Sequence, residues 1–194
     1  MNTKILNTFP ELETKRLMLR CVGRGDAKAL FDLYSHAEVM KYRGADTFSL
    51  VSEAEELIRH FEAQFKTKEG IRWVIAWKGK EEELIGTIGL KTIDWKNFRA
   101  EIGYELSPLL WNKNIMTEAL GCIAEYCFAK LNLHTLEANI APDHFASARV
   151  LQKTGFVKEA HYKENWYYKG WWDSDIYTLH ASDTPSTSCQ VVCG

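Results

Sequence analysis

Hydrophobic residues recur along the chain with two different periods, and these periods predict where helices and strands lie. One group of apolar residues has the three- and four-residue spacing of an amphipathic helix: Ala54, Leu57, Ile58, Phe61 and Phe65. Ser52 and Glu55 have the spacing of a capping box, which predicts that this helix begins near Ser52.

The same periodicity predicts three further helices. A helical stretch follows the turn at residues 23–26 and has Leu30, Phe31 and Tyr34 on one face. A short helix is expected over residues 143–154, where Gly155 ends it. A longer helix begins near Ile115, ends near Asn132 and carries one apolar stripe: Met116, Ala119, Leu120, Ile123 and Cys127.

Short runs rich in β-branched and aromatic residues predict seven strands. They cover residues 16–22, 71–77, 83–90, 100–106, 135–140, 156–170 and 171–181, the last two joined through Lys169-Gly170. The three middle runs predict an antiparallel meander. The resulting fold class is α/β (α+β), a mixed, mostly antiparallel sheet flanked by helices in a single domain over residues 1–181. Residues 182–194 have the composition of a loose tail.

Composition and charge exclude several classes of protein. The chain has 194 residues, of which 46% are hydrophobic, and 24 Lys and Arg oppose 26 Asp and Glu, for a net charge of −2. This argues against disorder and against wholesale binding to nucleic acid or to an anionic membrane. No apolar run approaches the length of a membrane span and no signal-peptide pattern is present, so a cytoplasmic address is expected. An anionic ligand would need a local binding device.

Neither the cysteines nor the histidines predict a metal site or a disulfide framework. The five cysteines are scattered, and reduced thiols are expected: Cys21, Cys122, Cys127, Cys189 and Cys193. Cys122 and Cys127 are expected to be packing residues within a helix. The six histidines show no close ligand spacing, so no metal is expected.

The segment over residues 100–120, AEIGYELSPLLWNKNIMTEAL, carries the most chemical information. A strand runs through a polar loop directly into a helix N-terminus. The first N–H groups of a helix have no partner within the helix and lie at the positive end of its dipole, so they bind phosphate well. This segment predicts the local device that the net charge requires.

These residues resemble the GNAT superfamily of acyl-CoA N-acyltransferases. The signature Gln/Arg-x-x-Gly-x-Gly/Ala aligns with Trp111, Asn114 and Met116, and residues 144–156 resemble the second family motif. The likeness extends from Glu13 to Ala181, and within the superfamily the sequence is most similar to the Rim-type branch, which acetylates protein N-termini. It implies acetyl-CoA as co-substrate, no metal, and cofactor contacts from twelve residues: Ile102, Tyr104, Leu106, Trp111, Asn112, Lys113, Asn114, Ile115, Met116, Thr117, His144 and Ser147.

Three departures from the family pattern affect the cofactor loop. Asn112 and Asn114 replace two glycines, and His144 replaces an asparagine. Asparagine tolerates a positive φ better than other non-glycine residues, so the loop backbone can keep its shape. Its side chain would nevertheless crowd a diphosphate, which predicts weakened affinity for CoA. Lys113 and Arg149 are candidate phosphate partners, or else solvated helix residues.

The resemblance also implies catalytic roles. Glu101 occupies the position of the glutamate base in one branch of the superfamily, and Glu105 on the same strand face is the second candidate. Either residue could instead be a solvated or salt-bridged carboxylate. Ser147 matches a serine that is proposed to bind the cofactor sulfur, and it could also cap a helix. Leu151 stands where many relatives have a general-acid tyrosine.

The sequence therefore predicts an N-acetyltransferase that moves acetyl directly to a primary amine, most simply a protein N-terminus. A polyamine-like acceptor and a non-catalytic acyl-CoA-binding module are the alternatives. The aromatic cluster of residues 166–172 could line the acceptor cleft or stack on nucleobases, but packing is favoured. No nucleic-acid or membrane partner is expected, and the protein is expected to be a monomer or homodimer.

Overall fold

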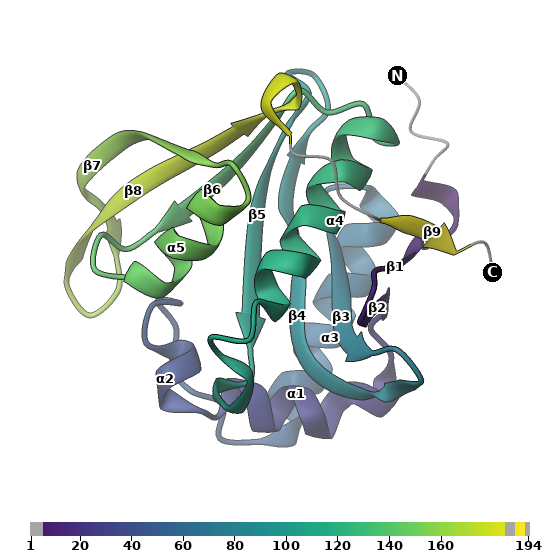
Figure 1. Cartoon of the computed structure of the whole chain (residues 1–194). Helices are drawn as coiled ribbons and strands as arrows, with labels where there is room; N and C mark the ends of the chain where they lie inside the picture. The colour runs from purple at the N-terminus through teal and green to yellow at the C-terminus, as the bar shows by residue number, and fades with distance from the viewer. Residues whose placement is uncertain (1–5, 185–188, 193–194) are drawn as a thin grey trace.

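A single mixed sheet runs through the molecule in the order β7-β8-β6-β5-β4-β3-β2-β1-β9 (Figure 1). The computed structural model describes residues 6–184 and 189–192. Neighbouring strands pair antiparallel except for β5 and β6, which are parallel. The strands are β1 (Glu11–Glu13), β2 (Leu17–Cys21), β3 (Ile71–Trp77), β4 (Lys80–Asp94), β5 (Arg99–Leu106), β6 (Thr135–Ile140), β7 (Val157–Tyr167), β8 (Trp171–His180) and β9 (Gln190–Val192).

Helices cover both faces of the sheet, and each face has its own hydrophobic core. The helices are α1 (Ala27–Tyr34), α2 (Ala37–Met40), α3 (Val51–Thr67), α4 (Ile115–Ala129) and α5 (Phe145–Lys153). α4 packs its buried residues against one face, and α1 and α3 pack theirs against the other. None of the helices in the described ranges is long and apolar enough to cross a membrane.

The predicted fold class and the central meander are confirmed, and the ranges of β3 and β6 match the prediction. The predicted cap of α3 is wrong. The helix begins at Val51, and the Glu53 carboxylate accepts the N–H groups of Ser49 and Leu50 at 2.7 and 2.8 Å. The short elements β1, α2 and β9 were not predicted, because three or four residues carry too little periodicity to show.

Strands β5 and β6 separate in a way that opens the sheet. They pair only from Arg99 to Glu101 and from Thr135 to Glu137, although β5 continues to Leu106 and β6 to Ile140. Past these three pairs one edge of β5 has no strand partner. The opening lies at the end of the sheet that faces the N-terminus of α4 and α5 (Figure 1).

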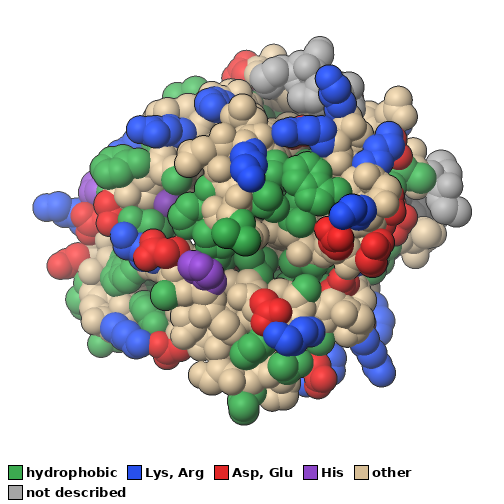
Figure 2. Space-filling model, turned by 60° about the horizontal axis from the view of Figure 1, so that its bottom comes forward, with side chains coloured by type: hydrophobic (Ala, Val, Ile, Leu, Met, Phe, Trp, Pro, Cys, Tyr) green, Lys and Arg blue, Asp and Glu red, His purple; other side chains and the backbone are tan. Residues whose placement is uncertain are grey.

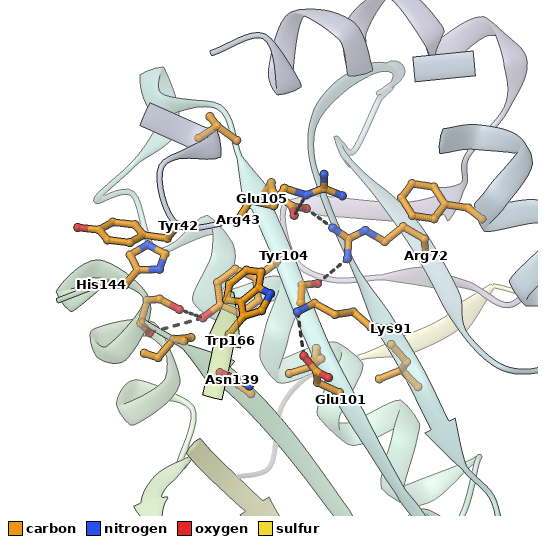
Figure 3. Close-up of a pocket in the computed structure, with 18 of the residues that line it drawn as sticks. Tyr42, Arg43, Arg72, Lys91, Glu101, Tyr104, Glu105, Asn139, His144 and Trp166 are labelled. Carbon is orange, nitrogen blue, oxygen red and sulfur yellow. Dashed lines mark hydrogen bonds and ion pairs between the residues drawn. The ribbon is translucent and has the colours of Figure 1, made fainter. Parts of the chain in front are cut away.

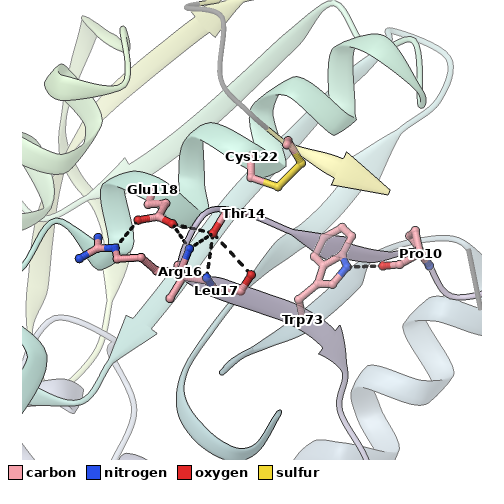
Figure 4. The surroundings of a disulfide bond; sticks show 8 residues. Pro10, Thr14, Arg16, Leu17, Trp73, Glu118 and Cys122 are labelled. Atoms are coloured by element: carbon pink, nitrogen blue, oxygen red, sulfur yellow. Dashed lines mark hydrogen bonds and ion pairs between the residues drawn. A yellow bond between two sulfur atoms is a disulfide. The ribbon is translucent and has the colours of Figure 1, made fainter. Parts of the chain in front are cut away.

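The expectation of reduced thiols is wrong for two cysteines. Cys122 in α4 forms a disulfide with Cys189, which precedes β9 (Figure 4). The residues stand 67 positions apart, and they meet because β9 pairs with β1 at the sheet edge. Within the expected tail, residues 190–192 form β9. Cys127 is buried and unpaired with another cysteine, as expected for a packing residue. Cys193 lies outside the described residues.

Candidate active site

Two cavities meet where β5 and β6 separate. The first has a volume of about 530 Å³ and lies between the loop before α4 and the start of α5. It gathers the predicted cofactor residues except Ile102, which lines the neighbouring cavity. Its lining includes Tyr104, Leu106, Trp111, Asn112, Lys113, Asn114, Ile115, Met116, Thr117, His144 and Ser147.

The loop before α4 takes the backbone shape that the family glycines would permit. Asn112 and Asn114 have φ values of 61° and 55°, in the left-handed region. Asn114 stands at the N-cap of α4 without a side-chain cap, so the N–H groups of the first turn stay available to a ligand. The indole N–H of Trp111 donates to the Leu106 carbonyl oxygen at 2.9 Å, which holds the loop against β5.

Hydrogen bonds from residues 14–16 hold the first turn of α4 in place. The Glu118 carboxylate accepts hydrogen bonds from the Thr14 hydroxyl at 2.6 Å, the Arg16 backbone N–H at 2.9 Å and the Arg16 Nε at 2.6 Å (Figure 4). Arg16 also donates to the Lys113 carbonyl oxygen at 3.2 Å. These bonds preorganise the helix end toward the cavity.

The first cavity, called the cofactor-side cavity below, has more basic than acidic side chains in its lining, although the whole chain is slightly acidic. The basic ones are Lys41, Lys113, Arg149 and Lys153, and the acidic ones are Glu38, Glu105 and Asp143. The face turned forward in Figure 2 carries Lys and Arg side chains around a group of hydrophobic ones, with Asp and Glu side chains also at its border. Sequence reasoning missed Lys41 and Lys153, although Lys153 follows Arg149 by one helical turn and so shares its face. The Lys153 ammonium also donates to Asn114 Oδ1 at 2.9 Å, which links α5 to the loop.

The unpaired edge of β5 presents amide groups to the opening. The Ser107 N–H donates to the Ile85 carbonyl oxygen on the β4 side at 2.9 Å. Backbone groups of successive strand residues point to opposite edges, so the amides of Leu106 and Tyr104 face away from β4, beyond the last pair of β5 with β6. Donors in this position can bind and polarise a thioester carbonyl.

The two cavities share a polar junction. The hydroxyls of Tyr104 and Ser147 lie 2.8 Å apart, and both residues line both cavities. Burial raises the pKa of the Tyr104 hydroxyl, so Tyr104 stays protonated. His144, stacked on Tyr42 at 4.2 Å, borders the same junction, and burial lowers the pKa of His144 to about 4. The alternative of Ser147 as a helix cap is wrong, because His144 occupies the N-cap of α5.

The second cavity, called the acceptor-side cavity below, has a volume of about 640 Å³ and is lined along β5 by five consecutive residues from Glu101 to Glu105 (Figure 3). Both predicted base candidates line it, as their shared strand face requires. The Glu101 carboxylate lies 2.8 Å from the Lys91 ammonium, and its side chain is 36% exposed. Glu101 is therefore a solvent-accessible carboxylate with one cationic partner.

Glu105 is held in a buried charge cluster. Its carboxylate pairs with the guanidinium groups of Arg72 and Arg43 and accepts hydrogen bonds from the hydroxyls of Thr87 at 2.9 Å and Tyr34 at 3.0 Å (Figure 3). Burial alone would raise the pKa of Glu105, but the two arginines outweigh burial and lower the pKa to about 2. A carboxylate so stabilised is a weak base, which favours the salt-bridged alternative for Glu105.

The aromatic hairpin of β7 and β8 closes one side of the acceptor-side cavity. Trp166 lines the cavity and packs against Gly44, where an added Cβ would lie 2.1 Å from the indole. The Tyr168 hydroxyl donates to Asp46 at 2.9 Å, and Lys169 pairs with the same carboxylate. Trp166 and Trp172 pack edge to face at 6.0 Å. Trp166 therefore both packs within the hairpin and lines the cavity.

A helix start with free N–H groups, strand-edge amides and a second cavity beside them are the features that an enzyme transferring acyl groups from CoA requires. The chain belongs to the GNAT acetyltransferase family, whose domain it matches over residues 16–157. It is an acetyl-CoA-dependent N-acyltransferase, and its Rim-type likeness is confirmed among other GNAT relatives.

Three relatives illustrate the range of this family. An uncharacterized N-acetyltransferase of Bacillus subtilis (strain 168), YoaA, is 38% identical over 172 residues, covering 88% of this chain and 97% of the relative. The ribosomal protein uS5-alanine N-acetyltransferase of Escherichia coli (strain K12) is 28% identical over 99 residues, covering 50% and 51%. The spermidine N-acetyltransferase of Vibrio cholerae, solved with CoA and spermine, has a TM-score of 0.75 at 24% identity, covering 86% and 96%.

Proposed function

We propose that the acceptor is the α-amino group of a protein N-terminus and that Glu101 is the base. The pairing of charges in the acceptor-side cavity carries this proposal. Its two acidic side chains, Glu101 and Glu105, are opposed by Arg43, Arg72 and Lys91. A polyamine carries several ammonium groups and needs carboxylates that lack cationic partners, whereas a peptide N-terminus brings one amine on a neutral backbone.

The charges in this cavity differ from those that a polycationic acceptor requires. The Vibrio cholerae relative was solved with spermine, a polycation. In the cavity described here the lining cations outnumber the lining carboxylates. The unpaired edges of β5 and β6 also offer backbone donors and acceptors that an extended peptide can use.

In the proposed reaction, residues of this chain remove the proton, bind the carbonyl oxygen and stabilise the leaving group. Glu101 lies three residues before Tyr104 on β5, about 10 Å along the strand, so it takes the ammonium proton through intervening water. The Tyr104 amide, on the unpaired edge of β5, holds the thioester carbonyl oxygen. The free amine attacks the carbonyl carbon, the C–S bond breaks, and the Ser147 hydroxyl donates a hydrogen bond to the departing sulfur.

The experiment is a free-thiol assay with acetyl-CoA, comparing short peptides that have free N-termini with spermidine and spermine. We expect thiol release with a subset of peptides and little with polyamines. Faster turnover of a polyamine than of every peptide would refute the proposed acceptor.

A pair of variants tests the base. Glu101→Gln should lose at least tenfold in kcat and keep its affinity for acetyl-CoA. Glu137→Gln is the matched control, because Glu137 is the register partner of Glu101 and pairs with Arg99 at 3.0 Å outside the cavity. Full turnover by Glu101→Gln, or an equal loss in both variants, would remove Glu101 from this role.

A further inference from the structure

The residue that many relatives use as general acid is replaced here by a leucine that cannot act on the reaction. Leu151 is fully buried in the core beneath α5. The departing thiolate must therefore be stabilised by other groups at the junction of the two cavities. Tyr104 and Ser147 are the hydroxyl-bearing pair whose oxygens are in contact there.

The contact admits a Tyr104 O–H that donates to Ser147. Tyr104 Oη lies 2.8 Å from Ser147 Oγ and 3.5 Å from the Ser147 carbonyl oxygen, and each hydroxyl can donate or accept across the shorter contact. When Tyr104 donates, the Ser147 Oγ accepts, and the Ser147 proton is left for another acceptor.

The acceptor that a helical serine most often uses is already occupied by other donors. A serine inside a helix often donates to the carbonyl oxygen four residues earlier, which for Ser147 belongs to Asp143. The Asp143 carbonyl oxygen accepts the Phe145 N–H at 2.9 Å and the Tyr42 hydroxyl at 3.3 Å. Two donors occupy both lone pairs of that oxygen. A Ser147 O–H that does not turn back to Asp143 can point into the junction, which Ser147 lines.

We propose that Tyr104 is a positioning residue, which holds the Ser147 hydroxyl so that it donates to the departing CoA sulfur. This inference rests on the proposed reaction. As the amine nitrogen bonds to the carbonyl carbon, the C–S electron pair moves to sulfur and the Ser147 O–H stabilises the thiolate. The thiolate then takes up the proton that the amine released, giving CoA thiol and amide. Because Tyr104 stays protonated, it keeps donating throughout.

The test measures the pKa of the CoA thiol bound to the enzyme, followed by the ultraviolet absorbance of the thiolate in a pH titration. This readout needs no acceptor. We expect bound CoA in the unmodified enzyme to titrate about one pH unit below bound CoA in Ser147→Ala, the effect of one charge-assisted hydrogen bond. Tyr104→Phe should show most of the same rise. The double variant should equal Ser147→Ala, because Tyr104 acts through Ser147.

Tyr126→Phe is the matched control. Tyr126 is a buried tyrosine in α4, and within the described ranges its hydroxyl has no hydrogen-bond partner. This variant should leave the thiol pKa unchanged. In turnover assays Tyr104→Phe should lower kcat about tenfold with KM for acetyl-CoA little changed.

The outcomes separate the two proposals. An unchanged thiol pKa in Tyr104→Phe, or additive effects in the double variant, would overturn the positioning role whatever the acceptor. A shifted thiol pKa together with no acetylation of peptides would support the positioning role and refute the proposed acceptor.

Discussion

Replacing Glu105 by Gln should reveal how strongly the buried charge cluster stabilises the fold. The side chain is 12% exposed, and its carboxylate neutralises the buried Arg72. The displacement of its pKa from 4.5 to about 2 corresponds to about 3 kcal/mol of folding free energy. The usual cost of leaving a buried charge unpaired, about 3–5 kcal/mol, is similar. We expect Glu105→Gln to be destabilised by about 3 kcal/mol at pH 7.

The pH dependence checks the origin of that loss. The folded-state pKa of Glu105 is lowered, so its contribution is complete above about pH 5 and disappears as the pH falls toward 2. Urea unfolding of both proteins at pH 7 and pH 3.5 should therefore show a smaller difference in unfolding free energy at pH 3.5. Glu137→Gln, which removes a more exposed ion pair, should cost less than about 1 kcal/mol. An equal difference at both pH values would refute the electrostatic explanation.

Two further predictions concern the disulfide and the cofactor loop. Reduction of Cys122–Cys189 with a dithiol should lower the melting temperature, with a loss of up to about 4 kcal/mol for a loop of 67 residues, whereas Cys189→Ser should melt at the same temperature with and without reductant. Asn112→Gly removes a left-handed asparagine and the side chain predicted to crowd the diphosphate, so calorimetry should show tighter binding of acetyl-CoA by about threefold to fivefold. Unchanged or weaker binding would contradict the crowding argument.

The cofactor side of the site could be predicted from sequence because it is local. A strand, a loop and a helix start follow one another within residues 100–117, so residues that are close in the sequence line the same cavity. The positive φ values of Asn112 and Asn114 likewise follow from residue type. Sequence reasoning reached the first cavity for this reason.

The remaining features depend on contacts between distant segments. Glu105 is a weak base because it pairs with Arg72 on β3 and with Arg43, which follows α2, and no sequence spacing shows that these residues meet. The Tyr104–Ser147 contact joins β5 to α5 across the opening of the sheet. The disulfide depends on three residues of β9 reaching β1. Such pairings follow from topology, which local periodicity does not encode.

Strand β9 has a practical consequence for experiments that need the protein on a surface. It lies five strand positions from β5, about 24 Å across the sheet. The hairpin of β7 and β8 occupies the other edge, next to the acceptor-side cavity (Figure 1). Attachment beside β9 would therefore leave both cavities facing solution, so biosensor binding curves for CoA and for peptides could be recorded on one immobilised sample.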